Sequence, residues 1–402
     1  MSSLKTAYYR TFQAVFNIGA RVLPWRKAAV VSGAGAIEKI PALLSELKVA
    51  KPLVVTDPGL MAVGVAPQIL KILEENKVSF ALFAEVEANP SVNTVNAIYD
   101  LYRESGCDGV IAIGGGSPMD AAKAAAARVV RPRKTVGQLG GLLRVRRKLP
   151  PFIAVPTTAG TGSETTIAAL ITDTETHYKY AIMDLSLIPR YAVLDPALTV
   201  GLPPSITAAT GMDALTHAVE AYLCWTYNTK ESIRFAEEAV EMIFRNLPKA
   251  YADGGNLEAR TQMLIASYKA GFAFTRAGVG NIHAVAHTLG GLYNTPHGLA
   301  NAVILPIVLE DYGKKIYPKL ARLAAIAGVA TGGGEEADAK AFIAAIRQFN
   351  ADMDIPAGFD FILDKDIPEM ARRAGKEANP IYPVPVVYDR ARYIAVIEKV
   401  RV

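Results

Sequence analysis

Several features are scarce in this chain of 402 residues, and each scarcity narrows its function. Only two cysteines are present, Cys107 and Cys224, which excludes a disulfide framework and favours a reducing cytoplasm. No apolar run reaches the roughly 18 residues of a membrane span, so we expect no membrane partner. The net charge of +5 is small, and the basic residues are not interleaved with aromatic ones, so no nucleic-acid partner is expected.

Acidic residues are missing from residues 1–28, and the first one is Glu38. An acid-free, amphipathic start with arginines is typical of organelle transit peptides, but it also fits a surface helix docked on the fold. We expect the docked helix, in an N-terminal extension of residues 1–27. The expected docking side chains are Tyr8, Tyr9, Phe12, Val15, Phe16 and Ile18.

Up to about residue 203, short apolar runs alternate with segments of helical period. The runs indicate strands at residues 28–31, 52–56, 80–83, 110–113 and 152–155, with further ones at 170–172, 180–183 and 192–194. Residues 60–75 and 92–104 have the period of helices. This alternation predicts an α/β domain with a parallel sheet and helices on both faces.

After Pro203-Pro204 the pattern becomes helical. Amphipathic runs cover residues 208–223, 231–244, 258–273, 282–292 and 339–349, and only residues 384–387 suggest a strand. Successive prolines cannot continue a helix or a central strand. We therefore expect two domains, residues 1–203 and an all-helical domain of residues 204–402.

A glycine-rich turn, Gly-Gly-Gly-Ser-Pro-Met-Asp at 114–120, joins an apolar strand to the helical run 121–127. Glycines let backbone approach a ligand closely, and a helix N-terminus attracts anions such as a pyrophosphate. We expect Ser117 to cap this helix and Pro118 to occupy its first position. An ordinary tight turn is the alternative.

Two further strand ends have a composition that suits a nucleotide. Residues 156–164, Pro-Thr-Thr-Ala-Gly-Thr-Gly-Ser-Glu, follow a strand and combine hydroxyl side chains with glycines, although a solvated loop would look similar. Ligands of open α/β sheets bind at such carboxyl ends. Asp57 ends another strand, where it would bond a ribose hydroxyl and repel a 2′-phosphate, or simply form a turn before Pro58. The first alternative favours NAD over NADP.

Histidine is also rare, yet four of the five histidines lie between positions 217 and 297. Asp213 and His217 are four residues apart, as are His283 and His287, so each pair shares one face of a helix. His297 follows shortly after. Imidazoles with one carboxylate suit Fe(II), Zn(II), Co(II) or Ni(II), whereas core or capping histidines are the alternative. The clustering favours a metal site.

Five motifs, in this order, give the chain a resemblance to a known family. They are the Asp57 strand end, the motifs at 114–120 and 156–164, Gly-x-Asp-Ala-Leu-Thr-His-Ala at 211–218, and His-Ala-x-Ala-His at 283–287 followed by Tyr-Asn-Thr-Pro-His-Gly at 293–298. From about residue 28 onward the chain resembles the iron-containing (group III) alcohol dehydrogenases. The resemblance implies a Rossmann-like nucleotide domain followed by a helical metal-binding domain with a dehydroquinate synthase-like fold.

The resemblance also implies a ligand set and cofactor contacts. Metal ligands are expected at Asp213, His217, His283 and His297, with Fe(II) as the expected metal and Zn(II) as the alternative. Contacts with NAD(H) are expected at Asp57, Gly115, Gly116, Ser117, Asp120, Thr157, Thr158, Thr161 and Lys179, and more loosely at Leu198. Phe274 and Arg276 are expected on the substrate side.

The function that the resemblance implies is hydride transfer between nicotinamide and a small alcohol or aldehyde whose oxygen the metal binds. His287, near the site without being a ligand, is the candidate proton relay, because the pKa of an imidazole is ordinarily about 6.5. Arg276 would hold an anionic group on the substrate, or else point to solvent or pair with a surface acid. We expect a homodimer or a higher homo-oligomer.

Other functions stay open at this point. A glycerol-dehydrogenase or dehydroquinate-synthase type of enzyme would have the same fold, and a sensor would bind metal and nucleotide without turnover. Asn281 replaces an apolar residue common in the family, which leaves the choice of substrate open. The remaining histidine, His177, is expected in a surface loop.

Overall fold

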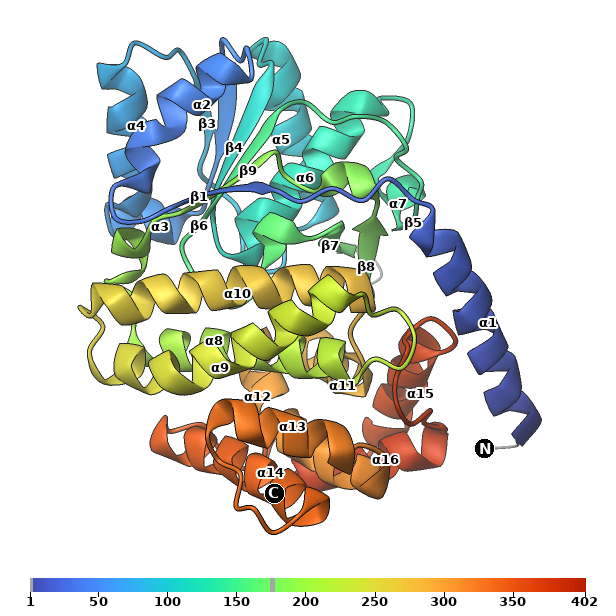
Figure 1. The fold of residues 1–402 in the computed structure, drawn as a ribbon. Helices are drawn as coiled ribbons and strands as arrows, with labels where there is room; N and C mark the ends of the chain where they lie inside the picture. The colour runs from blue at the N-terminus through green and yellow to red at the C-terminus, as the bar shows by residue number, and fades with distance from the viewer. Residues whose placement is uncertain (1–2, 174–177) are drawn as a thin grey trace. The chain divides into compact units, whose positions relative to one another are not determined.

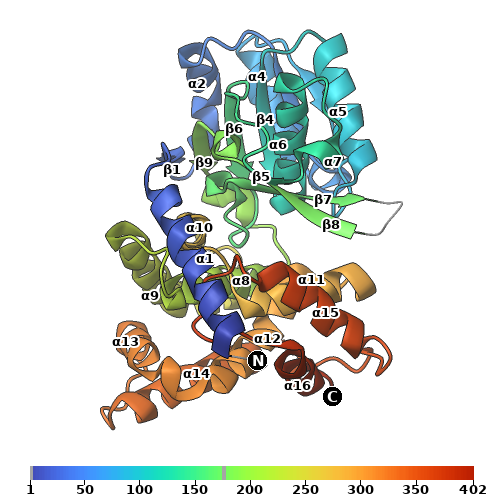
Figure 2. The same cartoon turned by 90° about the vertical axis from the view of Figure 1, so that its right-hand side faces the viewer.

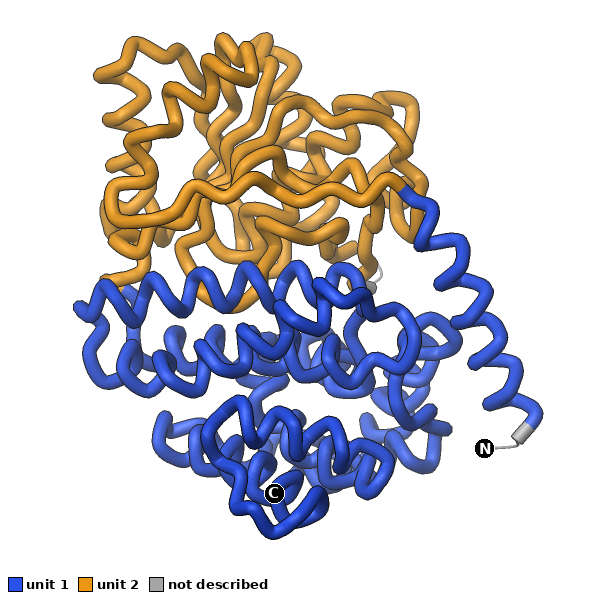
Figure 3. Tube along the Cα trace, viewed as in Figure 1, with its two compact units in different colours: residues 1–23, 202–402 blue, residues 24–201 orange. Residues whose placement is uncertain are grey.

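The computed structural model describes residues 3–173 and 178–402, and the chain divides into two compact units (Figure 3). The sheet unit is residues 24–201, and the helical unit combines residues 1–23 with residues 202–402. The division beside Pro203-Pro204 falls between Gly201 and Leu202. His177 lies outside the described residues.

Six parallel strands form the main sheet of the sheet unit, in the order β1-β9-β6-β4-β2-β3 (Figure 1). Their bounds are β1 Ala29–Ser32, β2 Pro52–Val55, β3 Ala81–Phe83, β4 Gly109–Gly114, β6 Phe152–Pro156 and β9 Tyr191–Leu194. All six begin and end close to the predicted apolar runs, which confirms the parallel sheet. Parallel strands require crossover connections, and helices supply most of them here.

Helices cover both faces of this sheet (Figure 1, Figure 2). They are η1 Ala36–Lys39, α2 Ile40–Glu46, α3 Pro58–Ala62, α4 Val65–Glu75, α5 Val92–Glu104, α6 Gly116–Val130 and α7 Val136–Leu139. Side chains of one strand alternate between two cores: Val110 packs with α5, α6 and α7, whereas Ile111 packs with α2 and α4. Burial on both faces explains why these strands read as continuous apolar runs.

A second, three-stranded sheet has the order β5-β8-β7, with bounds β5 Gly141–Leu142, β7 Ala168–Asp173 and β8 Tyr178–Met183. β7 and β8 are antiparallel and correspond to two of the predicted strands. Strand β5 is only two residues long and glycine-containing, so no apolar run could reveal it. Short helical turns η2 Ser163–Thr165, η3 Leu185–Leu187 and η4 Pro196–Thr199 complete the unit.

The helical unit is built from helices alone within the part of the chain that is described, apart from one bridge between Phe359 and Arg401. The helices are α1 Ser3–Arg21, α8 Pro204–Leu223, α9 Lys230–Ala252, α10 Leu257–Ala277, α11 Asn281–Tyr293, α12 His297–Tyr312, η5 Gly313–Lys315, α13 Tyr317–Ala327, α14 Glu335–Asp352, α15 Ile367–Ala378 and α16 Arg390–Val400. None of the described helices is long and apolar enough to cross a membrane.

The strand expected at 384–387 is wrong. Val384 and Val386 are buried, but they lie in a loop between α15 and α16. Pro383 and Pro385 each lack the N–H group that a strand would need for its ladder. The two buried valines gave this segment the alternating apolar pattern of a strand. Its prolines prevent the strand from forming.

The N-terminal helix α1 docks on the helical unit, whereas we had assigned residues 1–27 to the first domain. The predicted contact face is half right: Tyr9, Phe12 and Phe16 are partly buried, whereas Tyr8, Val15 and Ile18 are exposed. Phe16 packs on Tyr227 with ring centroids 5.5 Å apart, and polar side chains make further contacts. Gln13 Nε2 donates to the carbonyls of Pro380 and Tyr382 at 2.8 and 2.7 Å. Three more hydrogen bonds come from Arg10 to Val384 and Pro385 and from Asn17 to Thr226.

Candidate active site

The nucleotide motifs predicted from sequence lie on three neighbouring strands of the main sheet. β6, β4 and β2 are adjacent and parallel, so the segments that follow them share one edge of the sheet. These segments are residues 157–164, the glycine turn 114–117 and Asp57. Because ligands of open α/β sheets bind at the carboxyl ends of strands, this edge is the candidate nucleotide site.

Helix α6 begins earlier than expected, and Gly115 rather than Ser117 is its N-cap residue. No side chain caps this helix, which leaves its first N–H groups to bind an anion. Ser117 Oγ instead accepts a hydrogen bond from the N–H of Asn89 at 3.3 Å. A Cβ atom on Gly116 would lie 3.3 Å from the Thr161 methyl carbon, so glycine allows the two loops to approach closely.

A buried lysine fastens the hydroxyl-rich loop to helix α6. Lys123 Nζ lies 3.0 Å from Ser163 Oγ and 2.8 Å from Thr166 Oγ1. Burial lowers the pKa of Lys123 to about 8. Asp120, one of the expected cofactor contacts, accepts hydrogen bonds from Ser163 Oγ at 2.9 Å and from the N–H of Leu170 at 3.0 Å. Asp120 and Lys123 thus hold the conformation of this loop. The sequence analysis did not identify Lys123.

The other expected cofactor residues occupy varied surroundings. Asp57 caps α3 by accepting the N–H of Leu60 at 2.9 Å, and Thr157 is buried where β6 ends. Lys179 Nζ donates to Asn89 Oδ1 at 2.9 Å. Leu198 is buried in the core on the α2 and α4 side, so packing accounts for it. A Cβ atom on Gly115 would lie 3.3 Å from Thr158 Oγ1, so glycine at this position lets the two residues lie close together.

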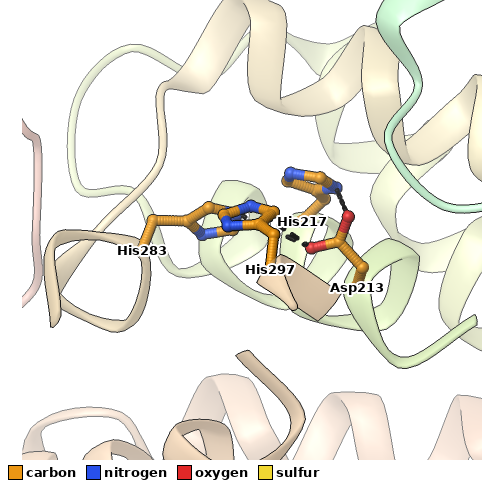
Figure 4. A group of neighbouring side chains, drawn as sticks. All are labelled: Asp213, His217, His283 and His297. Carbon is orange, nitrogen blue, oxygen red and sulfur yellow. Dashed lines mark ion pairs between the residues drawn. The ribbon is translucent and has the colours of Figure 1, made fainter. Parts of the chain in front are cut away.

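In the helical unit, Asp213, His217, His283 and His297 converge (Figure 4). Each offers one ligand atom, and these atoms all lie within 4.8 Å of one another. Asp213 Oδ1 is 3.6 Å from His297 Nε2 and 4.0 Å from His283 Nε2. The first three residues are buried, while His297 is partly exposed. The structure therefore brings together the four ligands expected from the sequence.

Three helices supply these side chains. Asp213 and His217 lie one turn apart on α8, His283 is in the first turn of α11, and His297 is the first residue of α12. A Cβ atom on Gly298 would lie 2.3 Å from the carbonyl oxygen of Ala209, so glycine lets the start of α12 approach α8. That approach brings His297 to Asp213.

Asn301 lies close to three of the four ligands. Asn301, one turn after His297 on α12, is fully buried, and its Nδ2 is 2.7 Å from Asp213 Oδ1. The same nitrogen is 3.1 Å from His283 Nε2 and 3.2 Å from His297 Nε2. Asp213 Oδ1, His283 Nε2 and His297 Nε2 therefore lie around one point. A set of three imidazoles and one carboxylate arranged in this way fits a divalent metal.

Glu220 contacts the side of the His283 ring that faces away from the metal cluster. The sequence analysis did not identify this residue. Its Oε2 is 2.6 Å from His283 Nδ1, and it accepts the N–H groups of Gly280 and Ile282 at 2.9 and 2.8 Å. Burial, followed by the neighbouring histidines, lowers the pKa of His283 well below its usual value, so this ring is neutral. Burial also raises the pKa of Glu220 to about 8, and the hydrogen bonds from Gly280, Ile282 and His283 oppose that shift. The contact of Nδ1 with Glu220 leaves Nε2 as the ligand atom.

Spacing along α8 and α12 could have revealed two of the missed residues. Asp213, His217 and Glu220 follow at intervals of four and three residues, which places them on one helical face. His297 and Asn301 are likewise four residues apart. Charged and polar residues at these intervals on a buried face indicate a shared site.

Of the two expected substrate residues, Phe274 contacts a residue of the metal cluster, and Arg276 lies near the charge of Glu231. The Phe274 ring stacks on His217, with ring centroids 4.1 Å apart, so it lies against the cluster. Arg276 is partly buried, which lowers its pKa, and the nearby charge of Glu231 opposes that shift. Asn281, the departure from the family, is fully buried and bonded to Tyr393 and Val386. It therefore serves the packing of α11.

Comparisons with known proteins agree with this geometry. The iron-containing alcohol dehydrogenase family matches residues 28–196, and the Fe-containing alcohol dehydrogenase family, C-terminal, matches residues 207–400. The chain is 41% identical to 1,3-propanediol dehydrogenase of Klebsiella pneumoniae over 335 residues, which cover 82% of this chain and 86% of that protein. It is 35% identical to NAD-dependent methanol dehydrogenase of Bacillus methanolicus over 373 residues, covering 91% and 97%.

A solved structure of 1,3-propanediol oxidoreductase superposes with a TM-score of 0.90 at 36% identity, covering 94% of this chain and all of that one. The family matches span both units and include every residue of the candidate metal cluster. This chain belongs to the iron-containing alcohol dehydrogenase family.

Proposed function

We propose that this protein is a metal-dependent, NAD(H)-linked alcohol dehydrogenase and aldehyde reductase that acts on a short, neutral alcohol or aldehyde. The observation that carries the proposal is the convergence of Asp213, His217, His283 and His297 on one centre in a member of this family. The substrate class is supported by the relatives named for 1,3-propanediol and methanol.

Each part of the site has a distinct task in this proposal. The four ligands hold a divalent metal, Fe(II) or Zn(II), and the glycine turn with the 157–164 loop holds NAD(H). When bound, the metal supplies Lewis-acid polarisation of the substrate oxygen, and the nicotinamide supplies the hydride chemistry. The ring of Phe274 offers an apolar wall beside the cluster. His287 exchanges the proton of the alcohol, directly or through water.

The charges around Arg276 bear on whether the substrate is neutral or anionic. A guanidinium is suited to a carboxylate, sulfonate or phosphate, but the carboxylate of Glu231 already acts on this charge. This nearby opposite charge supports the neutral substrate. An Arg276→Ala variant should then change KM for a neutral aldehyde and for an acidic one of similar size to the same extent. A selective rise for the acidic aldehyde would favour an anionic substrate.

Two further expectations belong to the proposal. A homodimer or a higher homo-oligomer is expected, and sedimentation of the purified protein measures it. A cytoplasmic location is supported by the free, buried state of Cys107 and Cys224, which suits a reducing compartment.

The decisive experiment follows the absorbance of NADH with metal-loaded protein and a panel of short aldehydes, with glycerol tested in the oxidative direction. Turnover of neutral aldehydes, lost on chelation and restored by Fe(II) or Zn(II), is expected. His297→Ala serves as the metal-free control. Turnover confined to glycerol would favour a glycerol-dehydrogenase type of enzyme. Binding of both metal and NADH without any turnover would favour the sensor and overturn the proposal.

A further inference from the structure

His287 lies against the metal cluster without being part of it. It follows His283 by one turn of α11, and its ring stacks on that of His297 with an interplanar angle of 17° and centroids 5.2 Å apart. It also meets the His283 ring edge-on at 5.9 Å. Its side chain is 20% exposed, so water can reach it.

A carboxylate from a distant helix holds this ring. Glu377 Oε1, near the end of α15, is 2.6 Å from His287 Nδ1. An ionised carboxylate only accepts hydrogen bonds, so Nδ1 carries the hydrogen and Nε2 carries the lone pair. Rotation of the ring would break this contact. The carboxylate thus fixes both the orientation and the tautomer of His287.

Glu377 is held in turn by Tyr382. The Tyr382 hydroxyl donates to the same Oε1 atom at 2.6 Å. Burial and then the charge of Glu377 raise the pKa of Tyr382 well above its usual value, so the hydroxyl keeps its proton. The backbone carbonyl of Tyr382 accepts a hydrogen bond from Gln13 at 2.7 Å, which ties this segment to α1. His287 and Tyr382 therefore meet at this carboxylate, and α1 holds the backbone of Tyr382.

We propose that Glu377, supported by Tyr382, is a positioning residue that keeps His287 ready to exchange a proton through Nε2. The inference rests on the proposed function, in which His287 is the proton relay. In alcohol oxidation, Nε2 accepts the proton that leaves the hydroxyl group and passes it to water, while the hydride goes to NAD⁺. Glu377 itself neither touches the substrate nor gains the proton.

A double-mutant cycle tests whether Glu377 acts through His287. The variants are Glu377→Gln, His287→Ala and the two combined, with kcat measured at saturating alcohol and NAD⁺. We expect Glu377→Gln to lower kcat by about 10 to 100-fold, and His287→Ala to lower it by about 10² to 10⁴-fold. The double variant should match His287→Ala alone, because the carboxylate then has no ring to hold.

Additional readouts separate positioning from a merely structural role. Glu377→Asp keeps a carboxylate and should recover part of the rate that Glu377→Gln loses. Metal content and the Kd for NADH should stay unchanged in each variant. Glu369→Gln is the matched control, since Glu369 is also on α15 but pairs with Arg372 and Arg373. It should leave kcat unaltered.

The outcomes distinguish the two levels of the proposal. If Glu377→Gln lowers kcat by the same factor with and without His287, or does not lower it at all, the positioning role is refuted. If His287→Ala keeps the wild-type kcat, the relay assigned under the proposed function fails, and the positioning role fails with it. Should Glu377→Gln not fold, Tyr382→Phe takes its place in the cycle, and additivity with His287→Ala refutes the proposal in the same way.

Discussion

Replacing Glu220 by glutamine isolates the electrostatic part of the support behind the metal cluster. The carboxylate faces three donors, namely His283 Nδ1 and the N–H groups of Gly280 and Ile282. Glutamine has the same shape but replaces one acceptor oxygen by an NH₂ group. In either orientation of the amide, that NH₂ group must face a donor.

The substitution should have two separate effects, one on folding stability and one on metal affinity. A buried donor left without an acceptor costs about 1–3 kcal/mol, so the free energy of unfolding of metal-free Glu220→Gln should fall by that amount. Groups that orient a metal-ligating histidine change metal affinity or activity by about 10 to 100-fold. This range corresponds to about 1.4–2.8 kcal/mol of metal binding free energy. Both effects are measurable.

Two assays read them independently. Urea unfolding of the metal-free protein gives stability, and competition with a chromophoric chelator gives the Kd for Zn(II). Glu310→Gln is the control, because Glu310 is an exposed glutamate on α12 that pairs with Arg347, and such surface pairs contribute about 0–1 kcal/mol. A Glu220→Gln protein that binds Zn(II) as tightly as wild type would show that Glu220 only caps α11. The reasoning about His283 would then be wrong.

Three further predictions concern other parts of the chain. His283→Ala and His297→Ala should lose the bound metal by elemental analysis yet still bind NADH, and stoichiometric metal in both would contradict the ligand assignment. Asp57→Gly should narrow the preference for NADH over NADPH in kcat/KM, because the carboxylate repels a 2′-phosphate; a wild type that prefers NADPH would refute this. Gln13→Ala should lower the free energy of unfolding by about 1 kcal/mol in urea, since two partly buried carbonyls lose their donor, whereas the exposed control Thr11→Ala should not. Equal effects of the two substitutions would exclude the docking role of Gln13.

The central strands β2, β4 and β6 of the main sheet were predictable because they are buried on both faces. Burial on both faces selects apolar residues at every position, so β4 and β6 appear as unbroken apolar runs. The metal cluster was predictable for a related reason, since helical spacing alone places Asp213 beside His217. Helical spacing accounts only for the pair Asp213 and His217, whereas the full ligand set with His283 and His297 came from the family resemblance.

The supporting carboxylates depend on longer-range packing. Glu220 and His283 are 63 residues apart, and Glu377 and His287 are 90 apart. Neither pair follows from local periodicity, because the contact exists only after α8 meets α11 and α11 meets α15. Glu220 at least shares a helical face with two ligands, whereas nothing near Glu377 in the sequence marks it. Support of this kind is visible only in the folded chain.

The partly wrong docking face of α1 has a physical explanation in the segment it covers. Residues 380–385 contain three prolines, Pro380, Pro383 and Pro385, which offer carbonyl groups but no N–H groups. Buried carbonyls need donors, and a segment so poor in N–H cannot obtain them from a regular backbone ladder. Side-chain donors on α1, chiefly Gln13 and Arg10, meet that need. Hydrophobic periodicity identified Phe16 but also named the exposed Tyr8, Val15 and Ile18, because it takes no account of backbone acceptors elsewhere in the chain that require donors.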